Sequence, residues 1–159
     1  MISNSYMELN KDQIKEVQQN REPYLMLDYV TKLEPGKLCE SYKELNEDEW
    51  FFTVHWPGDP NMPGMLQIEA LVQTAAISIL SLPNNKGKVM YLTSVNNVKF
   101  IKKITPKKRF YIKTKIISFK RGIAECMGTG IIDDKEACKA EFKLILPSEI
   151  ERYNINKEI

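Results

Sequence analysis

One segment of the chain constrains the fold more than any other, the apolar run from Met65 to Leu82 that follows a Pro-Gly pair. Its length suits a helix of about five turns and exceeds that of an ordinary strand. Glu69 and two amides, Gln67 and Gln73, occur near its start, where a membrane span would not normally hold them. The helix predicted over about residues 65–82 is apolar nearly all round, so the rest of the protein must wrap it rather than cover one side.

The chain after this helix has the pattern of strands joined by hairpins. Strands are predicted at residues 88–104, 109–119, 123–132 and 137–146, with turn signals such as Lys120-Arg121-Gly122 between them. The last strand alternates apolar with charged residues, which indicates an antiparallel strand with one buried face and places Cys138 in the core. A long apolar helix followed by such strands indicates an α+β fold, in which a curved antiparallel sheet surrounds the helix.

The chain before the helix predicts shorter elements. Asn10 followed by Gln13 resembles a capping box, which predicts a helix over about residues 11–20. Residues 24–33 are apolar and extended in character, and residues 38–45 and 50–54 are further strand candidates. With 159 residues of ordinary globular composition, the chain is expected to form a single domain over residues 1–159, ending in a tail at about residues 148–159.

Cysteine content and the N-terminus bear on the compartment. The three cysteines are an odd number and form no C-x-x-C pair, which argues against a disulfide framework and fits a reducing compartment. The N-terminal residues contain no apolar stretch of the kind that signal peptides have. We therefore expect a cytoplasmic protein without membrane insertion and without a nucleic acid partner.

Charge is unevenly distributed along the chain. Ten basic residues and no acidic one lie between Lys99 and Ala124, whereas the whole chain has 23 basic and 21 acidic residues. The remainder therefore has 13 basic against 21 acidic residues. A basic face on an otherwise acidic protein indicates an anionic partner, although a solvated strand face explains the run equally well.

The residues suited to chemistry lie in and around one loop. His55 is the single histidine of the chain, and it opens a stretch of ten residues that contains three prolines and two glycines. A lone histidine is more often structural or exposed than functional. This loop, however, leads directly into the apolar helix, and functional residues concentrate on loops that a rigid scaffold positions.

Glu69 is the second unusual residue, because apolar residues flank it about one turn into the helix. If Glu69 is buried, desolvation raises the pKa of its carboxyl group and makes that group suitable as a proton donor. The sequence is equally consistent with an exposed Glu69 on the edge of the helix. Gln73 lies four residues further on the same helical face and is placed to hydrogen-bond to Glu69. At the helix start, Gly64 offers an unpaired, positively polarised amide to a developing oxyanion.

Residues 55–73 read H-W-P-G-D-P-N-M-P-G-M-L-Q-I-E-A-L-V-Q. They closely resemble the signature of bacterial 3-hydroxyacyl-[acyl-carrier-protein] dehydratases of the FabZ type, approximately H-F-P-G-x-P-x-M-P-G-V-L-x-x-E-A-x-A-Q. The spacing of 14 between histidine and glutamate is reproduced. Residues 21–28, R-E-P-Y-L-M-L-D, are similar to the family's opening R-Y-P-F-L-L-V-D, and the resemblance extends over roughly residues 10–147.

The chain departs from the family pattern at four places. Val54 precedes the histidine where the family has glycine, and Trp56 follows it where the family has phenylalanine. Gln19-Asn20-Arg21 stands in place of P-H-R, and Pro106-Lys107-Lys108 in place of P-G-D. None of these changes removes a residue expected to take part in catalysis.

The resemblance implies the hotdog fold, in which a curved sheet wraps a long helix, and homodimers that often assemble into trimers of dimers. It also implies an active site shared by two subunits. His55 of one subunit would remove the C2 proton of the 3-hydroxyacyl thioester, and Glu69 of the other would protonate the departing 3-hydroxyl group, directly or through water. The Gly64 amide would polarise the thioester carbonyl, and Gln73 would be a further substrate-binding residue.

No cofactor is implied, because the substrate arrives on the phosphopantetheine arm of acyl carrier protein. Acyl carrier proteins are acidic, so the resemblance implies that the basic residues between Lys99 and Ala124 bind the carrier. The lysines predicted to bind the carrier lie early in the run: Lys99, Lys102, Lys103, Lys107 and Lys108.

Two other functions stay open for a chain of this fold. A hotdog thioesterase would hydrolyse the thioester, and a non-catalytic carrier-binding protein would keep the fold without the reaction. Retention of both His55 and Glu69 argues against each. Within the dehydratases, the alternative is a specialised enzyme for hydroxylated or otherwise modified acyl chains.

Overall fold

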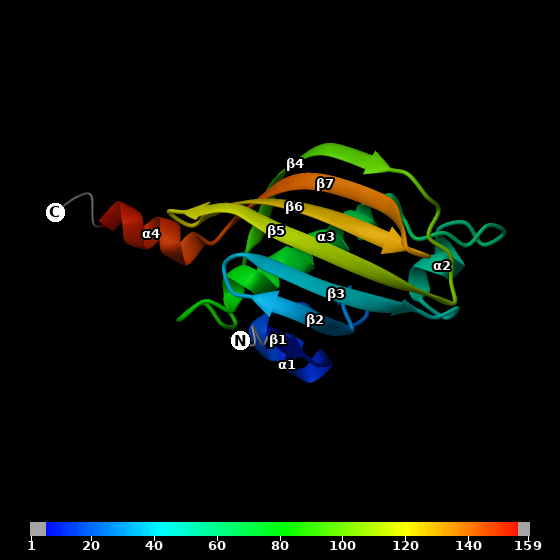
Figure 1. The fold of residues 1–159 in the computed structure, drawn as a ribbon, viewed down its shortest axis with the longest axis horizontal. Helices are drawn as coiled ribbons and strands as arrows, with labels where there is room; N and C mark the ends of the chain where they lie inside the picture. Colours follow the sequence, from blue (N-terminus) through cyan, green and yellow to red (C-terminus); the bar gives the residue numbers. More distant parts are fainter. Residues whose placement is uncertain (1–5, 156–159) are drawn as a thin grey trace, which may run out of the picture.

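The computed structural model describes residues 6–155, with side chains for residues 6–152, as a curved sheet wrapped around one long helix (Figure 1). All neighbouring strands are antiparallel, in the order β1-β2-β3-β5-β6-β7-β4. In chain order the elements are β1 (Met7–Leu9), α1 (Lys11–Val17), β2 (Tyr29–Glu34), β3 (Leu38–Leu45), α2 (Trp50–Val54), α3 (Gly64–Leu80), β4 (Tyr91–Phe100), β5 (Lys108–Lys120), β6 (Ile123–Ile132), β7 (Lys135–Ile145) and α4 (Pro147–Ile155).

Helix α3 is the core of the protein, as the apolar run predicted. Fourteen of its seventeen residues are buried. Two of its buried hydroxyl groups are satisfied by the sheet, since the Thr74 hydroxyl bonds to Ser41 at 2.7 Å and the Ser78 hydroxyl donates to the Glu34 carbonyl at 3.2 Å. Neither α3 nor any other helix among residues 6–155 is long and apolar enough to span a membrane.

Most predicted elements are present with shifted ends. Asn10 and Gln13 form the predicted capping box, but α1 ends at Val17 rather than near residue 20. Strand β4 begins at Tyr91 rather than at residue 88. The expected C-terminal tail contains α4, and β1 was not predicted, because three residues are too few to show an alternating pattern.

The segment Trp50–Val54, predicted as a strand, is the short helix α2, so that prediction was wrong. Its consecutive residues Phe51 and Phe52 are both buried. A strand would direct successive side chains to opposite faces, whereas a helical turn lets both pack into the core. A buried ion pair between Lys43 and Glu49, with 2.7 Å between nitrogen and oxygen, lies immediately before this helix.

The three cysteines are buried and unpaired, and Cys138 lies in the core as predicted. Burial raises the pKa of Cys126 to about 12 and that of Cys138 to about 11. Thiols with such pKa values are almost entirely protonated at neutral pH, so these residues contribute packing rather than nucleophilic chemistry.

Strand β4 forms one edge of the sheet, and most of its residues are exposed. Within residues 6–155 it pairs with β7 alone, which leaves its other edge without a strand partner. Its exposed side chains include the large apolar residues Tyr91, Leu92, Val98 and Phe100. An exposed apolar edge of this kind is suited to pairing with another chain.

Replacing Gly130 with alanine should destabilise the protein, because an added Cβ would lie 2.4 Å from the Phe110 ring and 2.7 Å from Cys138 Sγ. Both neighbours are fully buried, and overpacking a core costs about 1–3 kcal/mol. We expect the free energy of unfolding, measured by urea denaturation, to fall by about that amount. Gly58→Ala is the matched control, since nothing lies within 4 Å of its added Cβ. Equal stability of the two variants would contradict the close packing of β5, β6 and β7.

Candidate active site

His55 is held at both its backbone and its ring. It caps the C-terminal end of α2, where its backbone N–H donates to the Phe51 carbonyl at 3.0 Å. Ring atom Nδ1 lies 3.0 Å from the Asn61 carbonyl oxygen, which can only accept a hydrogen bond. In the neutral ring Nδ1 therefore carries the proton, and Nε2 keeps a free lone pair. Trp56 stacks on the ring with centroids 4.3 Å apart.

The loop that carries His55 is anchored to the segment between β4 and β5. The Met62 N–H donates to the Ile104 carbonyl at 2.8 Å, and the Ile104 N–H donates to Asn61 Oδ1 at 3.3 Å. The Met62 side chain is fully buried. This anchoring fixes the Asn61 carbonyl that orients His55.

A cavity of about 540 Å³, called here the His55 hollow, lies beside this loop. The residues around it that bear on chemistry or charge are His55, Gly64, Gln67, Phe100, Lys102 and Lys103. Gln67 was missed by sequence reasoning as a site residue. It is 4% exposed, its Nε2 donates to the Met62 carbonyl at 2.9 Å, and its buried Oε1 has no partner among residues 6–155.

Gly64 begins α3, as predicted. The Pro63 carbonyl accepts from the N–H groups of Leu66 and Gln67, while the Gly64 N–H makes no hydrogen bond within the described part of the chain. The helix N-terminus adds a partial positive charge at this amide. A Cβ at this position would lie 2.8 Å from the Phe100 ring, so only glycine fits beneath that ring without a shift.

Glu69 lies in a different depression, a groove of about 240 Å³ called here the Glu69 groove. Its side chain is half-buried rather than fully buried. The predicted hydrogen bond from Gln73 is confirmed, with 2.9 Å between Gln73 Nε2 and Glu69 Oε1. The same amide donates to the Tyr24 carbonyl at 2.9 Å and accepts from the Met26 N–H at 2.8 Å. Gln73 therefore ties the carboxylate of Glu69 to the backbone of residues 24–26.

Tyr24 is a second neighbour of Glu69 that sequence reasoning missed. Burial, and to a smaller extent the negative charge of Glu69, raise the pKa of its phenol. Tyr24 is 47% exposed, and its backbone carbonyl shares the Gln73 amide with Glu69. The one sequence signal was the position of Tyr24 in the segment R-E-P-Y, which resembles the family's opening motif.

Within one chain, His55 and Glu69 line different cavities. The His55 hollow includes Phe100, at the end of β4, and Ile101, whereas the Glu69 groove includes Leu92, at the start of β4, and Met90 just before the strand. The two cavities therefore lie toward opposite ends of the same exposed edge strand. The structure does not bring the two groups into one site within a single chain.

The lysines predicted to bind a carrier do not form a free basic patch. Lys99 lies on β4 opposite Lys139, and each of the others has a carboxylate partner. The ion pairs are Lys102 and Lys108 with Asp133, Lys103 with Asp59, and Lys107 with Glu47. Exposed pairs of this kind contribute little to stability, but they offset much of the local positive charge. Lys102 and Lys103 nevertheless lie at the rim of the His55 hollow.

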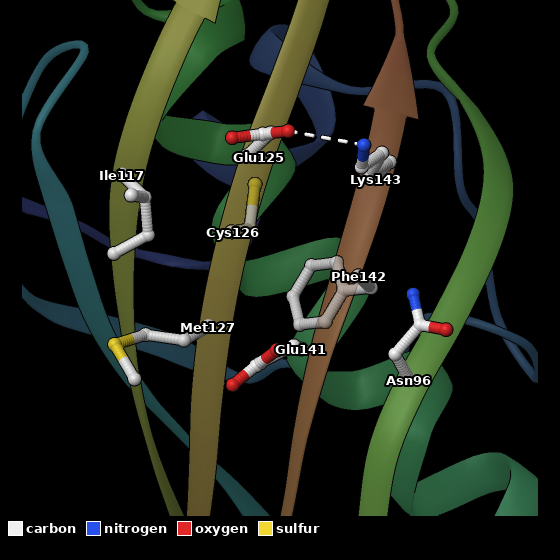
Figure 2. Close-up of a pocket in the computed structure, with 8 residues that line it drawn as sticks. All are labelled: Asn96, Ile117, Glu125, Cys126, Met127, Glu141, Phe142 and Lys143. Atoms are coloured by element: carbon white, nitrogen blue, oxygen red, sulfur yellow. Dashed lines mark ion pairs between the residues drawn. The ribbon is translucent and has the colours of Figure 1, made fainter.

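A third hollow, of about 390 Å³, opens on the outer face of the sheet (Figure 2). Glu125 forms an ion pair with Lys143 at 3.0 Å, and Glu141 accepts a hydrogen bond from Asn97 at 2.9 Å. Ile117 contributes an apolar side chain beside them. With its carboxylates partnered and no histidine nearby, this hollow lacks an acid–base pair. Among residues 6–155, no group of three His, Cys, Asp or Glu side chains is placed to hold a metal ion.

Comparison with known proteins identifies relatives over most of the chain. The family model described as a FabA-like domain matches residues 19–141. A 3-hydroxyacyl-[acyl-carrier-protein] dehydratase FabZ from Clostridium novyi is 39% identical over 137 residues, which cover 85% of this chain and 95% of that protein. The protein of the same name from Roseiflexus castenholzii is 34% identical over 141 residues, covering 89% and 99%.

Solved structures share the fold at low sequence identity, and they confirm the predicted hotdog architecture. The dehydratase heterocomplex ApeI:P from Xenorhabdus doucetiae aligns with a TM-score of 0.73 at 11% identity, covering 88% of this chain and 95% of that chain. A hypothetical thioesterase protein with coenzyme A from Streptococcus pneumoniae aligns with a TM-score of 0.58 at 13% identity, covering 74% and 83%.

Replacing Gln73 with leucine should destabilise the protein, because the Met26 N–H and the Tyr24 carbonyl would each lose their side-chain partner. Gln73 is 2% exposed, and leaving a buried polar group unpaired costs about 1–3 kcal/mol. Urea denaturation should show a loss of at least that size. Gln19→Leu removes a hydrogen bond from an exposed glutamine and is the matched control, with a change below about 0.5 kcal/mol. Equal effects of the two changes would contradict the structural role of Gln73.

Proposed function

The chain belongs to the FabA-like family and is a 3-hydroxyacyl-[acyl-carrier-protein] dehydratase, and we propose that its acid–base pair is His55 of one subunit with Glu69 of a second. The reaction converts the 3-hydroxyacyl thioester to the trans-2-enoyl thioester in fatty acid or related acyl-chain biosynthesis. The observation that carries the proposed pair is that the two residues lie in separate cavities of one chain, toward opposite ends of an exposed edge strand.

Pairing of two β4 edges about a two-fold axis would unite these cavities. In an antiparallel pair, the Phe100 end of one strand lies beside the Tyr91 end of the other. The His55 hollow lies at the first of these ends and the Glu69 groove at the second. One rotation therefore brings His55 of each subunit toward Glu69 of its partner and creates two equivalent sites. It also covers the exposed apolar side chains of β4.

The two groups carry out a balanced elimination. His55 Nε2 accepts the C2 proton, the electrons of that C–H bond form the C2=C3 double bond, and the C3–O bond breaks. Glu69 gives its proton to the leaving oxygen, so water departs. Return of one proton from His55 to Glu69 restores the pair. No electron leaves or enters the substrate, so these steps need no redox cofactor.

The remaining site residues hold the substrate and the acid. The Gly64 amide donates to the thioester oxygen, where negative charge develops as C2 loses its proton. Because Gln73 donates to one oxygen of Glu69, the other oxygen is left to carry the proton. Phe100 lies against Gly64 and limits the space in front of that amide.

For assembly and location we propose a homodimer, arranged as a trimer of dimers, in the cytoplasm. The exposed β4 edge supports the dimer, and three buried, unpaired cysteines fit a reducing compartment. The relatives of 34–39% identity are named dehydratases, which supports dehydration over the thioesterase and non-catalytic alternatives.

For the carrier we propose that Lys102 and Lys103 make the principal contacts. Both lie at the mouth of the His55 hollow, where the phosphopantetheine arm must enter to reach His55. Lys107 and Lys108 extend this charge along the turn into β5, and Lys99 is the most distant candidate because it lies on the β4 edge.

Replacing His55 with alanine or Glu69 with glutamine should lower kcat/KM for dehydration by about 10²–10⁴-fold, the usual contribution of an acid–base group. Mass spectrometry of the carrier-bound product, which loses one water on dehydration, measures the rate directly and distinguishes it from thioester hydrolysis. Glu141→Gln, on the outer face of the sheet, is the matched control and should keep full activity. Near-normal activity in a folded His55→Ala or Glu69→Gln protein would contradict the proposed acid–base role of the replaced residue.

Reversing the charge of Lys102 and Lys103 together should raise KM for carrier-linked substrate and leave kcat nearly unchanged. The increase should shrink at high salt, which screens exposed charges, and a short pantetheine thioester should be unaffected. Reversal of Lys113 and Lys115, exposed on β5, controls for net charge. Equal losses on both substrates would indicate damage to the fold rather than loss of a docking contact.

A further inference from the structure

The Glu69 groove has two walls of different chemistry. One wall is aliphatic and follows α3 away from Glu69 through Val72, Ala76 and Leu80. The other wall is polar and comes from residues 18–20, which follow α1. A groove that received only a hydrocarbon chain would gain nothing from this polar wall, because burying unpaired polar groups against hydrocarbon is unfavourable.

Gln18, in the polar wall, has a buried side-chain amide that is available to bind a ligand. It is 2% exposed, and neither its side-chain nitrogen nor its side-chain oxygen has a hydrogen-bond partner among residues 6–155. Its backbone is held in place, since its N–H donates to the Ile14 carbonyl at 3.0 Å and its carbonyl accepts from Arg21 at 2.9 Å. A fixed, buried amide with both groups unpaired is rare in proteins and indicates a partner that arrives from outside.

The neighbours of Gln18 in the chain contact the turn that follows α3, which lies beyond the end of the helix away from Glu69. Gly87, in the turn after α3, donates its N–H to the Val17 carbonyl at 2.8 Å and accepts from Gln19 Nε2 at 2.6 Å. The chain then runs back along α3 until residues 24–26 meet Gln73. Gln18 therefore lies beside the C-terminal half of the helix.

The length of the groove determines which part of a bound acyl chain would lie beside Gln18. From Glu69 to the level of Ala76–Leu80, the helix rises about 10–16 Å. An extended hydrocarbon with C–C bonds of about 1.5 Å covers that distance with about 8–12 carbons. An acyl chain whose C3 lies at Glu69 would therefore reach Gln18 near its distal end.

Resting on the proposed function, we propose that Gln18 hydrogen-bonds an oxygen-bearing group near the distal end of the acyl chain. The enzyme would then prefer long 3-hydroxyacyl chains that carry a second hydroxyl or a carboxyl group over plain chains of the same length. An amide both donates and accepts, which suits a hydroxyl group. Lys88 lies in the same groove, where its Nζ donates to Asn85 Oδ1 at 3.4 Å. Within residues 6–155 no ion pair joins it to a carboxylate, so it adds a positive charge that suits a carboxylate.

The test compares carrier-bound 3-hydroxyacyl chains of increasing length, each in plain, ω-hydroxylated and ω-carboxylated form. Once the chain is long enough to reach Gln18, kcat/KM of the wild-type enzyme should be about three- to tenfold higher for an oxygenated chain than for the plain one. Gln18→Leu should abolish this preference and raise the Tm, because it removes an unpaired amide from the interior. Glu16→Gln, at an exposed position of α1 that does not line the groove, is the control and should keep the preference. If the wild-type enzyme prefers the ω-carboxylated chain and this preference is weaker in Lys88→Gln, the group recognised is the carboxylate.

Equal kcat/KM for plain and oxygenated long chains would overturn the inference, and so would a preference that survives Gln18→Leu. A lower Tm for Gln18→Leu would also count against it, since the amide would then be satisfied in the free protein. Short plain chains end before Gln18 and should be dehydrated equally well by both proteins. Their turnover separates failure of this inference from failure of the proposed function, which would abolish dehydration at every length.

Discussion

Burial of α3 on nearly every side is the constraint on which the rest of the structure depends. A helix with fourteen of seventeen residues buried requires a sheet long and curved enough to surround it. Small residues in the inner strands allow this close packing. Gly128 lies against Leu71 of the helix, and Gly130 lies against the ring of Phe110. The same curvature ends in an unpaired edge, β4, so the wrapping that buries the helix also creates the edge at which a second subunit can pair.

The polar residues of α3 divide according to what surrounds them. Thr74 and Ser78 face the sheet and are satisfied by it, whereas Gln67 and Glu69 face the two cavities. Glu69 therefore stays accessible from its groove while Gln73 ties it to the protein backbone. A charged carboxyl group on a fully wrapped helix would be costly, whereas a position at the margin of the buried surface keeps the carboxyl group of Glu69 accessible, as the proposed proton transfer requires.

Local patterns predicted local features well. The capping box of Asn10 and Gln13 and the Gln73–Glu69 hydrogen bond follow from spacing along a helix, and both are present. The helical turn at Phe51 was not predictable, because a segment of five residues is too short to show a resolvable period. The partners of the basic run, the separation of His55 from Glu69 and the unpaired amide of Gln18 depend on the path of the chain in space. No spacing in the sequence contains that information.

The central claim is that each active site combines residues of two subunits, and mixed dimers test it most directly. His55→Ala chains and Glu69→Gln chains would be unfolded together, refolded and assayed for dehydration. Random pairing makes about half of the dimers mixed, and one of the two sites in each mixed dimer is intact, so about a quarter of wild-type activity should return. A site contained in one subunit would not recover, since every chain carries a lesion. Absence of recovery in dimers shown to be mixed would therefore contradict the shared site.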